Sequence, residues 1–80
     1  MKVLFQFGGA ATPKDRRRVV TRIENEGARR VKRMFPRERD AELANLHFAE
    51  VDDEKAGEIL RLLNGDEHVD YAEIPPTRGL

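Results

Sequence analysis

The sequence predicts one α+β domain, in which a four-stranded antiparallel sheet has two helices on one face. Three observations lead to this prediction. Residues 2–7 carry apolar side chains at every second position, as a half-buried strand does. Two later segments carry apolar side chains at the spacing of an amphipathic helix. The other apolar segments are short and strand-like, so the expected order is strand, helix, strand, strand, helix, strand.

The first strand is expected at residues 2–7 and the first helix after Thr12. Thr12 suits an N-cap because Pro13 takes the first helical position and Asp15 can reach back to the cap amide. Gly27 supplies the stop at the other end. The apolar face of the strand is made by Val3, Phe5 and Phe7, and that of the helix by Val19, Val20 and Ile23.

The second helix has the clearest apolar stripe in the chain. We expect Asp52 or Asp53 to cap its beginning, and Gly65 to end it in the left-handed conformation that glycine tolerates. The stripe, at positions i, i+3, i+4 and i+7, consists of Ala56, Ile59, Leu60 and Leu63.

Three further strands complete the predicted sheet. Residues 28–35 and 43–51 are joined by a short charged turn, which favours an antiparallel hairpin. Residues 69–74 form the last strand. Right-handed crossovers place the first and third strands in the centre of the sheet. The whole pattern is that of the ferredoxin-like βαββαβ fold.

Composition narrows the function classes. The 80 residues include no cysteine and no serine, so a disulfide, a thiolate metal site and the commonest nucleophiles are all absent. His47 and His68 have no partner at metal-ligand spacing, and we expect both at the surface or at a strand edge. The sequence therefore predicts a protein that is not an enzyme, with no catalytic residue, no metal and no cofactor.

Charge and hydropathy bear on location and partners. No segment has the length of a membrane span, and the apolar run after Lys2 is too short for a signal-peptide core. We therefore expect no membrane association, and a cytoplasmic protein as the sequence is given, or an extracellular one if a longer precursor was trimmed. Residues 1–40 hold twelve basic and five acidic residues, whereas residues 41–80 hold three and ten. Such a chain can pair its own halves or present two faces of opposite charge.

Two helices cover only one face of the sheet, so the other face should be open. It should carry Leu4, Gln6, Met34 and Tyr71. Such a face is either a docking surface or an ordinary surface with single exposed apolar residues, and the sequence leaves both open.

Two other function classes remain as alternatives. Basic residues gather between positions 16 and 33, which would suit RNA binding, but residues 43–51 lack the Gly-aromatic pattern of RNA-recognition modules. Nucleic acid is therefore not the partner we expect. The third class is a small-molecule or oligomerisation module of the same topology.

Three segments, in their order along the chain, resemble the subtilisin-propeptide family, which comprises small inhibitor and folding-assistant domains of subtilisin-like serine proteases. They are residues 24–35, with a glycine turn and a strand, residues 51–63, with the second helix, and residues 66–73. The last segment reads DEHVDYAE and is similar to the family's acidic turn followed by Val-x-Tyr-Val-Glu. The resemblance covers essentially the whole chain.

The resemblance implies a protease inhibitor, also a folding chaperone, whose partner is a subtilisin-like serine protease. It implies a domain at residues 1–74 that is monomeric when free and an extended tail at residues 75–80. In the family, the open sheet face docks on two parallel surface helices of the protease, and a glutamate at the end of the last strand caps one of them. Glu73 occupies that position, whereas Pro75 stands where the family often has a second acidic residue.

The resemblance also gives the tail a role. In the family, the tail lies in the substrate cleft as an extended, product-like strand. Here Leu80 would fill the pocket for the residue before the scissile bond. The tail residues that would lie in the cleft are Thr77, Arg78, Gly79 and Leu80. Whether the chain is a stand-alone inhibitor or an isolated propeptide is left open.

Overall fold

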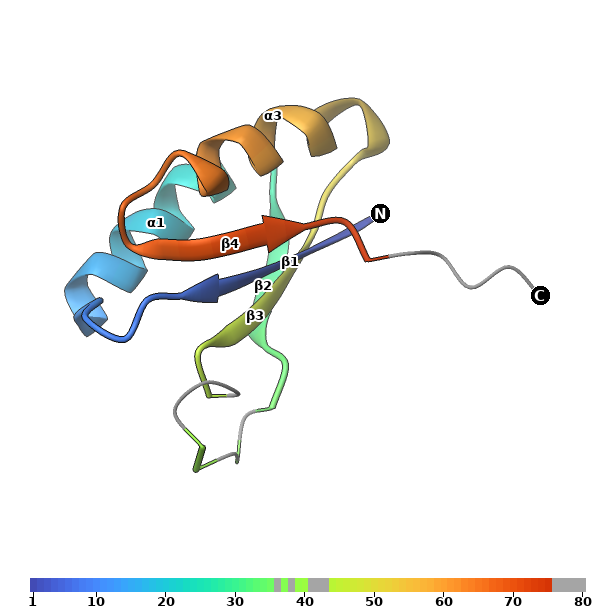
Figure 1. Ribbon diagram of the computed structural model, residues 1–80. Helices are drawn as coiled ribbons and strands as arrows, with labels where there is room; N and C mark the ends of the chain where they lie inside the picture. Colours follow the sequence, from blue (N-terminus) through green and yellow to red (C-terminus); the bar gives the residue numbers. More distant parts are fainter. Residues whose placement is uncertain (36, 38, 41–43, 76–80) are drawn as a thin grey trace.

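Two helices pack on one face of a four-stranded antiparallel sheet in the computed structural model (Figure 1). The structure describes residues 1–35, 37, 39–40 and 44–75. The strand order is β2-β3-β1-β4, so the first and third strands are central, and the predicted ferredoxin-like topology is confirmed. The elements are β1 (Lys2–Phe7), α1 (Pro13–Asn25), β2 (Arg29–Arg33), β3 (Leu46–Glu50), α3 (Asp53–Asn64) and β4 (Val69–Glu73).

The core lies between the sheet and the two helices. The alternation in β1 buries Phe5 and Phe7, whose rings meet edge to face with centroids 5.4 Å apart. From the helices, Ile23 of α1 and Ile59 and Leu63 of α3 are also fully buried. Each such side chain contributes about 1.5–3 kcal/mol by leaving water, so this small set supplies much of the stability of the domain.

The ends of α1 follow the sequence prediction. The Thr12 backbone N–H donates to Asp15 Oδ2 at 3.0 Å, and the Asp15 N–H donates to the Thr12 hydroxyl at 3.1 Å, which completes a capping box. At the other end, Gly27 has φ +113°, a conformation that only glycine adopts without strain.

The ends of α3 differ in detail from the prediction. Asp52 is the N-cap residue, but its side chain makes no capping hydrogen bond. Instead, its Oδ1 accepts a hydrogen bond from Arg29 Nη2 at 2.9 Å. The predicted left-handed conformation of Gly65 is wrong, since its φ is −88°. The helix ends with a hydrogen bond in which the Gly65 N–H donates to the Arg61 carbonyl at 3.0 Å.

The hairpin strands are shorter than the expected residues 28–35 and 43–51. The Ala28 N–H donates back to the Ile23 carbonyl, so Ala28 completes the turn that ends α1. At the other limit, the Ala44 N–H donates to the Asp40 carbonyl at 2.8 Å and not to a neighbouring strand. Arg30 has φ +50°, and the β2–β3 register shifts between Arg29 and Lys32. The strand β2 therefore contains an irregularity that its sequence did not predict.

Candidate functional site

The sheet face opposite the helices gathers the residues predicted to dock. In the register, Leu4 of β1 lies between Phe48 of β3 and Glu73 of β4. Gln6, two residues on, lies between Leu46 and Tyr71. Because side chains two residues apart on a strand share a face, these residues lie together on the side that the helices leave uncovered.

Met34 extends this face toward β2. Its N–H donates to the Leu46 carbonyl at 2.9 Å, which continues the pairing of Lys32 with Phe48 by one more step along the same face. All four residues predicted for the docking face are thus brought onto one surface. The open face is defined here as Lys2, Leu4, Gln6, Lys32, Met34, Leu46, Phe48, Glu50, Tyr71 and Glu73.

The centre of the open face is apolar and its margins are charged. Phe48 is half-buried, and Lys2 Nζ lies 5.1 Å from the centroid of its ring, a cation–π contact. Tyr71 is 41% exposed. The charged members comprise two lysines and two glutamates, so the face as a whole is close to neutral. An apolar centre with a mixed charged rim is typical of protein-docking surfaces.

Glu73 is the last residue of β4, where the chain leaves the sheet. Its side chain is exposed, and Ile74, which follows, is 40% exposed. The predicted tail residues Thr77, Arg78, Gly79 and Leu80 lie outside the described residues. Their predicted contacts therefore stay a prediction, as does the division of the chain at residue 74.

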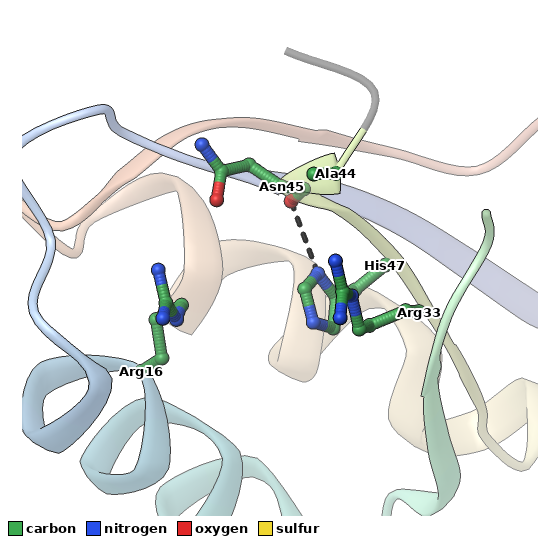
Figure 2. Close-up of a pocket in the computed structure, with 5 residues that line it drawn as sticks. All are labelled: Arg16, Arg33, Ala44, Asn45 and His47. Carbon is green, nitrogen blue, oxygen red and sulfur yellow. Dashed lines mark hydrogen bonds between the residues drawn. The ribbon is translucent and has the colours of Figure 1, made fainter. Parts of the chain in front are cut away.

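A pocket of about 350 Å³ lies on the other side of the sheet, between α1 and the β2–β3 hairpin. Figure 2 shows Arg16 of α1 on one wall and Arg33 of β2 beside His47 of β3 on the opposite wall. Ala44 and Asn45 also line it. The sequence predicted none of this, because the pocket joins three elements that are far apart along the chain.

His47 corrects an expectation. It is not a simple surface residue, since its half-buried ring stacks on Phe5 at 5.6 Å and meets Phe7 edge to face at 5.0 Å. Its Nδ1 lies 3.0 Å from the Asn45 carbonyl oxygen. Burial lowers the pKa of His47 below its ordinary 6.5, the Asn45 carbonyl partly offsets this, and the charges of Arg33 and Arg16 lower the pKa further.

His68 joins the start of α1 to the turn before β4. Its Nδ1 lies 3.7 Å from Asp15 Oδ2 of the capping box, and its Nε2 lies 3.6 Å from Glu67 Oε1. Across the described part of the chain, no three histidine or acidic residues are grouped so as to hold a metal ion. Nor does any helix among those residues have the length and apolarity needed to cross a membrane.

Comparison with known proteins yields no match to a protein-family model, a curated protein or a solved structure. The geometry of the open face and the chemistry of the residues that it gathers are therefore what indicate a function.

Proposed function

We propose that this protein inhibits a subtilisin-like serine protease and assists the folding of that protease through the same contacts. Its open face docks on the protease, and its C-terminal tail occupies the substrate cleft. The observation that carries the proposal is the register of Leu4 with Glu73 and of Gln6 with Tyr71, which combines an apolar surface, an exposed carboxylate and the exit of the tail at one edge of the sheet.

The docking step buries the apolar centre of the open face. Leu4 and Phe48 lie directly opposite each other on β1 and β3, so their side chains restrict each other and little side-chain freedom is lost when a partner covers them. Tyr71, the most exposed aromatic residue of this face, is the natural anchor for a pocket on the partner.

Glu73 supplies the directional contact. Its exposed carboxylate stands at the end of β4, where it can accept hydrogen bonds from the free N–H groups at the start of a partner helix. A carboxylate at a helix N-terminus would stabilise the complex by about 0.3–2 kcal/mol. The higher values apply when docking excludes water from the contact.

The tail step follows from the direction of β4. The strand ends at Glu73, and Pro75 fixes one backbone angle directly beyond it, which restricts the paths open to residues 76–80. Five extended residues span at most about 17 Å, which is long enough to lie along a substrate cleft. A free carboxylate at Leu80 would then stand where a cleaved product ends.

An inhibition assay tests the proposal. Cleavage of a chromogenic peptide by a subtilisin-type protease is measured with the full chain, with a form ending at residue 76, and with Leu80→Asp. Slow, tight inhibition by the full chain and its loss in both altered forms are expected. Full inhibition by the truncated form would refute the tail step, and no inhibition by the full chain would refute the proposal.

Single-stranded RNA binding is the competing function class, and the half-buried Phe48 on a central strand is the observation that favours it. Lys2 already lies over the ring, and Glu50 and Glu73 balance the charges of Lys2 and Lys32 on the same face, so the open face has no positive excess to attract a phosphate backbone. Salt-dependent binding of mixed-sequence RNA, abolished by Phe48→Ala, would support this class against inhibition.

A further inference from the structure

The pocket beneath α1 has a chemistry that protease inhibition does not use. Its two arginines come from different elements, Arg16 from α1 and Arg33 from β2, and face the same space (Figure 2). Their positive charges repel each other, and an anion between them would be attracted by both.

Other arginines of this fold form ion pairs with carboxylates. Arg29 and Arg30 pair with Asp52 and Glu50. In the part of the chain that the structure describes, neither Arg16 nor Arg33 pairs with a carboxylate. The Arg16 guanidinium donates to the Ala11 carbonyl over a long distance of 3.5 Å.

His47, which lines the same pocket, can also act as a hydrogen-bond donor to a ligand. A carbonyl oxygen only accepts, so the 3.0 Å contact with the Asn45 carbonyl assigns the Nδ1 proton to His47. The other ring nitrogen, Nε2, is then free to gain a proton when an anion arrives. Burial opposes this protonation most, and the charges of Arg33 on β2 and Arg16 on α1 add to that opposition. An anion between the two arginines would offset the part that is due to their charges.

We propose that this pocket binds the phosphate group of a small phosphate monoester, with Arg16 and Arg33 as the two clamping groups and His47 as a third donor. Two guanidinium groups match a dianion in charge and in their paired N–H geometry. The volume of about 350 Å³ is at the small end of ligand pockets, which suits a phosphate with a short organic group.

The site is separate from the open face. Arg33 lies opposite His47, and His47 lies opposite Phe5, so both share the face of the sheet that the helices cover. A protease docked on the open face would therefore leave the pocket accessible. The phosphate site and the protease contacts can be tested independently of each other.

The test is an NMR titration of the full chain with inorganic phosphate and then phenyl phosphate, at constant ionic strength set with chloride. The variants are Arg16→Gln and Arg33→Gln, and the control is Arg17→Gln, which removes the same charge from an exposed position next to Arg16 on α1. Well-dispersed amide spectra show that each variant is folded. A second readout, separate from the affinity, is the pKa of His47, followed through its ring proton.

Saturable shifts at Arg16, Arg33 and His47 are expected, with affinity reduced about tenfold in either pocket variant and little changed in the control. Phosphate should raise the pKa of His47 in the parent chain but not in Arg33→Gln. Equal weakening by Arg17→Gln would overturn the site in favour of general charge attraction. Tighter binding of a short RNA at the same residues would overturn the monoester, because a phosphodiester would then be the ligand.

Discussion

Asn64 and Ala72 exchange two hydrogen bonds: the Ala72 backbone N–H donates to Asn64 Oδ1 at 2.9 Å, and Asn64 Nδ2 donates to the Ala72 carbonyl at 3.2 Å. The amide of the last residue of α3 thus occupies the place beside β4 that a neighbouring strand would take. It also fixes the helix to the strand that leads to the tail, so the proposed binding region depends on one side chain of a different element.

Asn64→Ala removes both bonds at once. We expect a loss of about 1–2 kcal/mol in the free energy of unfolding, because each hydrogen bond contributes about 0.5–1.5 kcal/mol and water can reach part of the freed backbone. Urea denaturation measures it. Asn25→Ala is the matched control, since Asn25 also ends a helix but is exposed, and it should change stability by less than about 0.5 kcal/mol. Equal effects would mean that the Ala72 contact is unimportant.

Two glycines should respond to alanine in opposite directions. Gly57 lies inside α3, and a Cβ there meets no atom within 4 Å, so Gly57→Ala should stabilise by about 0.5–1 kcal/mol. Gly27 has φ +113°, so Gly27→Ala should destabilise by about 1 kcal/mol or more. Thermal unfolding compares the two. A shift of the same sign in both would contradict the assigned backbone conformations.

The capping box predicts a stability effect and an acid response. Thr12→Ala should cost about 1 kcal/mol, whereas Thr12→Ser keeps the hydroxyl and should cost much less. The Thr12 backbone N–H and then its hydroxyl hold the pKa of Asp15 below 3.8. Because the folded state favours the carboxylate, its stabilisation is present above that value and is lost as the pH falls through the lowered pKa. The stability difference between Asp15→Asn and the parent should therefore shrink in acid, as denaturation near neutral and acid pH would show.

His47 predicts a different pH range. Its folded pKa is lowered from 6.5, so the unfolded chain binds the proton first as the pH falls. The free energy of unfolding should therefore decrease as the pH is lowered from about 7 to the lowered pKa of His47. The substitution His47→Gln should remove that decrease. Urea denaturation across this range tests it. An unchanged pH profile in the variant would assign the decrease to another group.

Two residues of the open face should separate binding from folding. Glu73→Gln should weaken inhibition by roughly twofold to thirtyfold, in line with the value of a carboxylate at a helix N-terminus. Tyr71→Ala should weaken it by tenfold or more if it anchors the contact. Both side chains are exposed, so unfolding temperatures should change little. Glu58→Gln, on the outer side of α3, is the charge-matched control and should inhibit like the parent.

The fold was predictable because its signals are local. The alternation in β1, the capping box of Thr12 and Asp15, and the stripe of α3 each depend on residues close in sequence, and all three are confirmed. The strand ends, Gly65 and the irregularity at Arg30 were not predicted, since they depend on which backbone partners the finished fold supplies.

The candidate sites divide in the same way. The four residues of the predicted docking face could be placed on one side of the sheet because strand periodicity fixes the side on which each side chain lies. The pocket could not be predicted, because Arg16, Arg33 and His47 line a common space only when α1 is packed over the β2–β3 hairpin. His47 in particular looked like a surface residue, since nothing in its own strand reveals the two phenylalanine rings against which it packs.

The irregularity at Arg30 has a consequence for the behaviour of concentrated protein. An outer strand with a continuous row of free N–H and C=O groups invites other molecules to add to it and grow a fibre. In β2, the positive φ of Arg30 interrupts that row between Arg29 and Lys32. Each outer strand thus has a feature that hinders the addition of strands from other molecules: the backbone irregularity at Arg30 on β2 and the Asn64 amide on β4. A variant that lacks both features should aggregate, because further copies of the protein can then add to the edges of the sheet.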